Sequence, residues 1–240
     1  MRQGILPLWT RVIFVDWHGV LSRDLFWTSI LNSARHPLRT RLEAKLAEIF
    51  APGAPVGHEW MKGLRSSDEI VSTMAIELPG GFKSDYLHRR LEEDCRRMTI
   101  NVELFGFLRA LRQQDMAVAV VIATDNMDCF AHAFDYVRQH ARRPYGSSAR
   151  LADWAVFCDD MICSSDLGKL KNEDPLGFFG PWLAEYELSF SEALLIDDRT
   201  DNCRAFTEAG GTAVQWKLGL ADTGVVARSI DSWLMASVSR

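Results

Sequence analysis

The stretch VIFVDWHGVLS, residues 12–22, decides how the rest of the chain is interpreted. Four apolar residues precede a carboxylate, Asp16, and a glycine follows at position 19. A short apolar run bounded by turn residues is typical of a buried strand in a parallel sheet. We therefore expect Asp16 at the carboxyl end of a strand, with His18 two residues further along.

Further apolar runs repeat this pattern along the chain. They are MAVAVVIATD (116–125), WAVFCDDMICSS (154–165), ALLIDD (193–198) and GTAVQW (211–216). Helical spacing of apolar residues occurs between runs, clearly at 102–114 and less regularly at 175–188. Strands that alternate with helices predict an α/β fold, a Rossmann-like parallel sheet sandwiched by helices.

The gap between the first two predicted strands is too long for one crossover. A crossover helix needs about a dozen residues or somewhat more, whereas the second strand begins only near Met116. The intervening chain has helical patterns at 39–50, 67–78 and 84–98. We therefore predict an α/β core of residues 1–22 and 100–240, with an α-helical domain, 23–99, inserted into it.

Composition excludes several classes of protein. The 240 residues are 48% hydrophobic and 25% charged, as in a globular protein, and the net charge of -5 offers no basic surface for nucleic acid. No apolar stretch is continuous enough to span a membrane, so no membrane partner is expected. Five scattered cysteines lack metal-site spacing and are expected to be reduced, as in a cytoplasmic protein.

Polar residues gather where the predicted strands end. They are Asp16, then Thr124 with Asp125 and Asn126, then Lys169 and Lys171 beyond the third strand, and finally Asp197 and Asp198. Ligands of open parallel sheets bind at this edge. Two carboxylates ~4 Å apart repel by about 4 kcal/mol at an effective dielectric of 20, so cations must lie among them. A lysine and a hard dication such as Mg²⁺ meet this need, and together they suit a phosphoryl group.

Four motifs in this order resemble the haloacid dehalogenase (HAD) superfamily. They are VIFVDWHGVL (12–21), VVIATDN (120–126), SSDLGKLKNEDP (164–175) and LLIDDRTDNCRAF (194–206). The resemblance extends over nearly the whole chain and is to the phosphatase-like subgroup with an α-helical cap inserted after the first strand. It implies a HAD-like core, an α-helical cap over residues 23–99, and a Mg²⁺-dependent hydrolase of phosphoric monoesters that acts on a small phosphorylated molecule.

The resemblance also implies a role for each motif residue. Asp16 would be the nucleophile that forms an aspartyl-phosphate, and Thr124 would bind a phosphoryl oxygen. Lys171 would stabilise the nucleophile and the charge that develops during the reaction. Lys169 is an alternative to Lys171, because KLKNED departs from the usual Lys-Pro. Mg²⁺ would be bound by Asp16, the backbone carbonyl of His18, Asp197 and Asp198, with Asn202 in support. Trp17, Asp125 and Asn126 are further expected substrate contacts, with Trp17 at the mouth of the site.

His18 departs from the family pattern, which has a second aspartate at this position as acid and base. Three interpretations follow. Imidazole can itself donate and accept a proton near neutral pH. Alternatively, the chain is a C–P or C–halogen hydrolase that lacks this acid, and for C–P cleavage only Lys45 and Lys62 are near enough to form a Schiff base. In the third interpretation, the protein binds a phosphorylated ligand or a protein partner without catalysis.

The predicted cap would cover the site and contact the organic part of the substrate. Several of its side chains could line the cleft: Arg39, Arg41, His58, Trp60, Lys62 and Arg65. The sequence leaves the oligomeric state and the identity of the substrate open.

Overall fold

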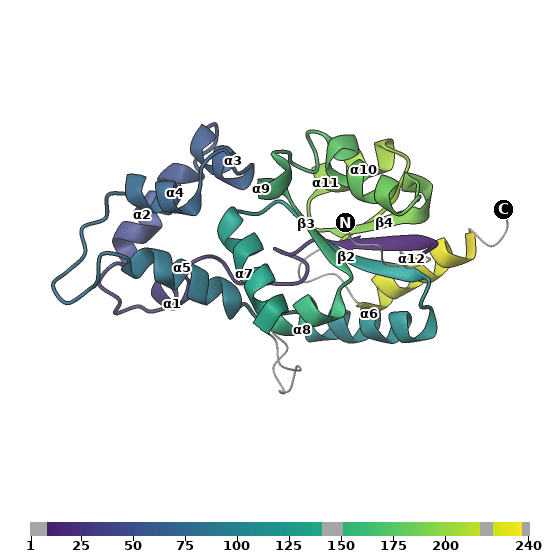
Figure 1. The fold of residues 1–240 in the computed structure, drawn as a ribbon, viewed down its shortest axis with the longest axis horizontal. Coiled ribbons are helices and arrows are strands. Elements are labelled where there is room, and N and C mark those ends of the chain that lie inside the picture. The colour runs from purple at the N-terminus through teal and green to yellow at the C-terminus, as the bar shows by residue number, and fades with distance from the viewer. Residues whose placement is uncertain (1–8, 141–150, 217–222, 237–240) are drawn as a thin grey trace.

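Five parallel strands form one sheet in a computed structural model of the chain (Figure 1), which describes residues 9–140, 151–216 and 223–236. The strands are β1 (Arg11–Val15), β2 (Val118–Thr124), β3 (Asp160–Cys163), β4 (Ala193–Asp197) and β5 (Thr212–Gln215). Their order is β3-β2-β1-β4-β5. β1 is central, and Val15 is in register with Ile122 of β2 and Ile196 of β4. The predicted fold class is therefore confirmed.

Helices cover both faces of the sheet (Figure 1). One face packs against α6 (Val102–Gln114), α7 (Asp128–His140), α8 (Leu151–Phe157) and α12 (Thr223–Ala236). The other packs against α10 (Pro175–Glu185) and α11 (Thr200–Glu208). Side chains alternate between the faces of a strand. Accordingly, Ile13 and Val15 pack on the face covered by α6, α7, α8 and α12, and Val12 and Phe14 pack on the face covered by α10 and α11. Both faces of β1 are therefore buried.

Five helices lie between β1 and α6 in the chain. They are α1 (Thr28–Leu31), α2 (Arg39–Ile49), α3 (Pro55–Met61), α4 (Ser67–Thr73) and α5 (Tyr86–Arg96). Figure 1 shows them gathered at one side of the sheet, and we call residues 23–99 the insert. Hydrogen bonds tie its two ends together: Asn101 N donates to the Leu21 carbonyl at 2.7 Å, and Thr99 N donates to Asp24 Oδ2 at 2.6 Å.

The expected strand at 154–165 is only partly correct. Residues 151–157 form α8, and the strand itself is limited to Asp160–Cys163. The reason is the spacing of the buried residues Leu151, Trp154, Ala155 and Cys158, which follows i, i+3, i+4, i+7 and therefore one face of a helix. The short α9 (Ser164–Leu167) follows β3 directly.

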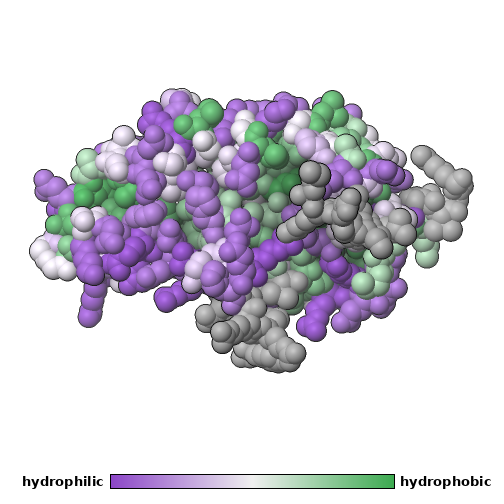
Figure 2. All heavy atoms as spheres, viewed as in Figure 1, coloured by the Kyte–Doolittle hydropathy of each residue, from purple (hydrophilic) through white to green (hydrophobic). Residues whose placement is uncertain are grey.

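Two other expected helices end early. The one at 67–78 ends at Thr73, because Ala75 adopts a positive φ of 48°, and the one at 175–188 ends at Glu185, before Glu187 at φ 57°. The capping box of Ser66 and Glu69 is present at the start of α4. In the part of the chain that the structure describes, no helix combines the length and apolar content that a membrane crossing requires. Figure 2 shows that hydrophilic side chains predominate on this face of the molecule, with smaller apolar groups between them.

Candidate active site

Lys171 forms ion pairs with two of the carboxylates at the strand ends. Its Nζ lies 2.8 Å from Oδ1 of Asp16 and 2.6 Å from Oδ2 of Asp197, and it donates to the Ala123 carbonyl at 3.1 Å. Asp16 follows β1 and its backbone N–H donates to Ile196 of β4. Lys171 is only 1% exposed. Lys169 instead pairs with Asp174 at the surface, so Lys171 is the lysine that the fold brings to the strand ends.

The buried charges of this cluster shift one another's pKa values. Burial raises the pKa of Asp16 to about 8; Lys171 opposes this shift and Asp197 adds to it. Burial alone would lower the pKa of the Lys171 ammonium, but Asp16 and Asp197 outweigh that effect and raise it. Lys171 therefore stays protonated at neutral pH. Once Asp16 has lost its proton, one ammonium does not balance the carboxylates around it, which leaves the cluster short of positive charge.

Asp16, Asp197 and Asp198 form a carboxylate trio whose ligand atoms all lie within 4.8 Å of one another. Oxygen donors grouped in this way suit a hard dication. Both oxygens of Asp197 already accept hydrogen bonds, from Lys171, from the backbone of Arg199 and from the amide of Asn202. Asp16 and Asp198 thus have more lone pairs free for a metal, while Asp197 holds the site together.

The turn after β1 passes directly over Asp198. Gly19 has a φ of +88°, and a Cβ added there would lie 2.6 Å from Cγ of Asp198. Asp198 is half-buried, and burial together with the neighbouring Asp197 raises its pKa. This close approach brings the backbone after Asp16 to the acid pair after β4.

The loop after β2 forms the neighbouring wall of the site. Thr124 ends the strand and is fully buried, and Asn126 N donates to Ser164 Oγ at 2.9 Å. Oδ1 of Asp125 accepts from the backbone of Lys171 at 3.0 Å, whereas its buried Oδ2 has no hydrogen-bond partner among the described residues. Burial raises the pKa of Asp125.

No protein-family model matches the chain, and no curated protein matches it. Several solved structures, in contrast, match the chain. A HAD family enzyme from Bacteroides thetaiotaomicron matches with a TM-score of 0.62 and 19% identity, over 90% of this chain and 98% of that one. A "predicted HAD-like family hydrolase" from Porphyromonas gingivalis matches with a TM-score of 0.61 and 19% identity, over 92% and 97%. The L-2-haloacid dehalogenase from Xanthobacter autotrophicus is more distant, with a TM-score of 0.53 and 11% identity over 92% and 82%.

The chain has the fold of the HAD superfamily. The Bacteroides enzyme has also been solved in complex with magnesium and inorganic phosphate. In this HAD fold, the four motifs quoted above meet at the carboxyl edge of the sheet, since each follows a different strand.

Trp17, expected at the mouth of the site, is instead buried, and it borders a cavity of about 240 Å³ between the insert and the core. The side chain has no exposed surface. Its ring packs against Phe130 of α7 with centroids 5.0 Å apart, and its indole N–H donates to the sulfur of Met98. Burying this large ring beneath α7 stabilises the fold, and Trp17 shares the wall of the cavity with His18, Asp125 and Asn126. Trp17 therefore forms part of the inner wall of this cavity.

His18, in contrast, is exposed. It lies on the turn between Asp16 and Gly19 and borders this cavity of about 240 Å³ between the insert and the HAD-like core. Asp125 and Asn126 border the same cavity. The structure shows no hydrogen bond or ion pair of the His18 side chain with any described residue, so its ring nitrogens are available to a ligand.

Asp128, which the sequence did not single out, and Ser164, which opens the third motif, connect the insert to the core. Asp128, at the start of α7, accepts hydrogen bonds from the backbone and hydroxyl of Ser67 and, at 3.2 Å, from the indole of Trp60. Ser164 Oγ donates to the Met61 carbonyl at 2.6 Å. The only available signal was that Asp128 and Ser164 follow strand ends, a position they share with the site residues.

The charged insert residues proposed for the cleft are engaged elsewhere. Each makes an ion pair or a backbone hydrogen bond: Arg39 with Glu43, Arg41 with the Glu77 carbonyl, Lys62 with Glu173 and Arg65 with Glu59. Lys45, considered only as a Schiff-base lysine, pairs with Glu48. Trp60 is buried against Asp128, and His58 borders a separate hollow. None of the six side chains predicted for the cleft borders the 240 Å³ cavity.

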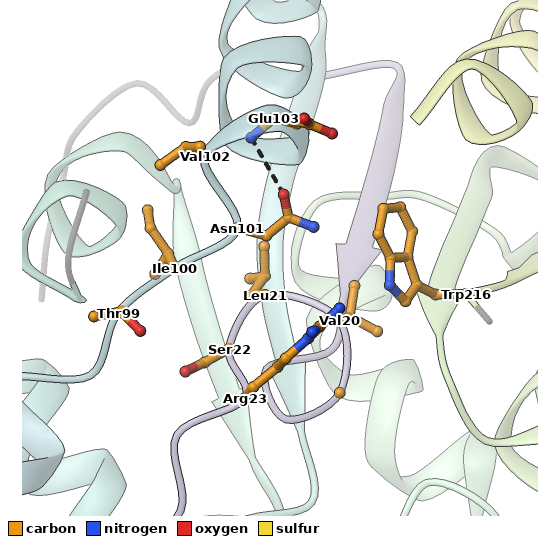
Figure 3. A pocket seen from close by; sticks show the side chains of 11 residues that line it. Val20, Leu21, Ser22, Arg23, Thr99, Ile100, Asn101, Val102, Glu103 and Trp216 are labelled. Atoms are coloured by element: carbon orange, nitrogen blue, oxygen red, sulfur yellow. Dashed lines mark hydrogen bonds between the residues drawn. The ribbon is translucent and has the colours of Figure 1, made fainter. Parts of the chain in front are cut away.

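A wider hollow of about 470 Å³ lies where the insert joins the core (Figure 3). It is bordered by the turn after β1, residues 19–23, by residues 99–103 and by Trp216. Asn101 Oδ1 accepts from Glu103 N there and caps α6. The hollow has one arginine and one glutamate and no cluster of ligating groups, so we assign no ligand to it.

Proposed function

We propose that this protein is a Mg²⁺-dependent phosphohydrolase that acts on a small phosphorylated molecule, with Asp16 as the nucleophile and residues 23–99 as a cap domain. The observation that carries the proposal is the buried bridge from Lys171 to Asp16 and Asp197, with Asp198 completing the carboxylate trio. The Bacteroides structure with magnesium and inorganic phosphate supports the choice of ion and of phosphoryl chemistry.

The donor set fits Mg²⁺, because it consists of hard carboxylate oxygens at an edge of the sheet that is short of positive charge. Asp16, Asp198 and the backbone carbonyl of His18 would bind the ion, and Asp197 would orient the set. When bound, Mg²⁺ neutralises charge on the phosphoryl group and on the carboxylates.

The reaction would follow from what the side chains can reach. A carboxylate oxygen of Asp16 attacks phosphorus, an Asp16 O–P bond forms, and the bond from phosphorus to the leaving oxygen breaks. Lys171 holds the other Asp16 oxygen and, with the Thr124 hydroxyl, stabilises the phosphoryl oxygens. Water then cleaves the acyl phosphate and restores the Asp16 carboxylate.

We assign His18 the proton transfers of both steps. Its imidazolium would donate a proton to the leaving oxygen, and the neutral ring would then take a proton from the attacking water. The His18 side chain is exposed and borders the cavity, and it makes no competing hydrogen bond to a described residue. These observations support this role.

The other hydrolase interpretations fit less well. A phosphonatase needs a lysine amine free to form an imine, yet Lys45 and Lys62 both make ion pairs. A dehalogenase needs no metal, whereas the carboxylate trio offers a binding site for one.

Phosphate release from p-nitrophenyl phosphate with Mg²⁺ tests the proposal. We expect activity that chelation abolishes and that Asp16→Asn reduces by roughly 10³-fold or more, because the nucleophile is lost. Activity that survives Asp16→Asn contradicts the assignment. If no phosphoester is hydrolysed while Mg²⁺ and phosphate still bind at Asp16, the protein is instead a binding protein for phosphorylated ligands.

A further inference from the structure

The 240 Å³ cavity adjoins the proposed site directly. Asp125 and Asn126, which follow Thr124, form part of its wall, and His18 lies at its rim. The insert and the core close the rest of it with apolar side chains: Trp17, Leu25, Phe26, Phe50, Met61, Met98 and Met127, together with Asp24. A group attached to a phosphate at Asp16 would therefore enter a mostly apolar space.

The size of the cavity limits what can enter. A cavity of about 150 Å³ already admits benzene, so 240 Å³ holds a six-membered ring with a few further atoms. Met61, Met98 and Met127 line it with unbranched, polarisable side chains, which adapt to the shape of an apolar ligand. A nucleotide or a disaccharide would exceed this space.

The charged side chains around the cavity disfavour ligands whose organic part carries an anionic group. No lysine or arginine borders it, whereas two carboxylates, Asp24 and Asp125, do. Oδ2 of Asp125 is buried without a hydrogen-bond partner among the described residues. A carboxylate on the substrate would lose its hydration there and meet two acids, and His18 is the one basic side chain among the described residues that border the cavity.

We propose, on the basis of the function proposed above, that the preferred substrates are phosphate monoesters of small, uncharged, apolar alcohols or phenols. Met61 and Phe50 of the insert would set this preference. The absence of a cationic side chain from the cavity would exclude substrates with a second anionic group.

A paired comparison tests this specificity. Benzyl phosphate presents an apolar ring and phosphoglycolate presents a carboxylate at similar length. We expect kcat/KM with Mg²⁺ to favour benzyl phosphate by about 10- to 100-fold, the factor that burial of one ring supplies. Equal values of kcat/KM for the two substrates, or a higher value for phosphoglycolate, would overturn this proposal. Neither result would contradict the phosphohydrolase function.

A positive charge placed in the cavity should weaken the preference for benzyl phosphate. Met61→Lys introduces an ammonium at the wall, and we expect it to narrow the ratio of the two kcat/KM values at least tenfold. Leu64→Lys is the matched control, because Leu64 belongs to the same segment, is 69% exposed and does not border the cavity. If both variants keep the wild-type ratio, the cavity does not hold the organic group.

A binding measurement separates this proposal from the catalytic one. Benzylphosphonate and phosphonoacetate resist hydrolysis, and their affinities can be measured by calorimetry with Mg²⁺ even if the protein hydrolyses nothing. Tighter binding of benzylphosphonate supports the apolar cavity in that case, while equal or reversed affinities contradict it.

Discussion

Gly19 and Asp198 lie so close together that no side chain fits between them. A Cβ atom on Gly19 would lie 2.6 Å from Cγ of Asp198, and the φ of Gly19 is +88°. The glycine therefore allows the turn that carries His18 to pack directly against Asp198, a proposed metal ligand.

Gly19→Ala should weaken metal binding beyond its effect on the backbone. The left-handed conformation costs a non-glycine residue about 1–2 kcal/mol of folding stability, and the added methyl group must also displace Asp198. We expect Mg²⁺ affinity, measured by calorimetry, to fall about 10- to 100-fold, as when a metal ligand loses its support. Gly81→Ala is the control, because Gly81 has a φ of +95° and open space around it. Equal Mg²⁺ affinity of the two variants would show that the contact does not matter.

Asp128→Ala should loosen the attachment of the insert. Asp128 accepts hydrogen bonds from Ser67 and Trp60, and without it the buried Ser67 backbone N–H loses its side-chain acceptor, while the Trp60 indole keeps only Ser67 Oγ. Loss of a charged acceptor of this kind costs about 1–3 kcal/mol. We expect lower stability in urea unfolding and faster hydrogen exchange of the amides in α4. The control is Asp135→Ala, in the exposed part of the same helix; identical exchange in both variants would refute the role.

His18→Asn should slow the reaction without releasing the metal. The proposed role of the side chain is proton transfer, which contributes about 10²- to 10⁴-fold to rate, whereas its contact with Mg²⁺ would use the backbone carbonyl. We expect kcat to fall within that range and Mg²⁺ affinity to stay the same. His18→Asp should retain more activity than His18→Asn, because a carboxyl group can transfer protons. An unchanged kcat in His18→Asn would rule out the assignment.

Mg²⁺ binding should strengthen as pH rises toward 8. In the metal-free protein, burial raises the pKa of Asp16 to about 8, so below that pH the carboxyl group carries a proton that the ion must displace. Because the pKa of Asp16 is raised, protons compete with Mg²⁺ for its carboxylate at pH values below about 8. We expect affinity to fall by up to about tenfold per pH unit below 8. Calorimetry in buffers of different ionisation enthalpy should detect the released proton; affinity that is constant from pH 6 to 8, without proton release, would contradict this.

The sheet and the strand-end residues could be predicted from the sequence because both are local patterns. An apolar run followed by Asp16, or by Asp197 and Asp198, marks a buried parallel strand and its end. The topology then places those ends at one edge. The choice between Lys169 and Lys171 could not be made in this way, because it depends on which lysine the turn after α9 directs inward.

Features that depend on contacts between distant segments were not predictable. The neighbours of Trp17 in the sequence indicate a place near the site, but its burial on the cavity wall depends on contacts with Phe130 and Met98, far along the chain. The docking of Ser67 on Asp128 likewise joins segments whose spacing shows no pattern. The error at 154–157 had another cause, since a short apolar run fits a strand and a buried helix equally well.

A crystal structure of the protein with Mg²⁺ and beryllium fluoride tests the central claim most directly. We expect the fluoroberyllate to be bonded to a carboxylate oxygen of Asp16, within reach of Thr124 and Lys171, with Mg²⁺ held by Asp16 and Asp198. An unmodified Asp16 with no ion among the three carboxylates, under conditions where both reagents are in excess, would contradict the proposed site.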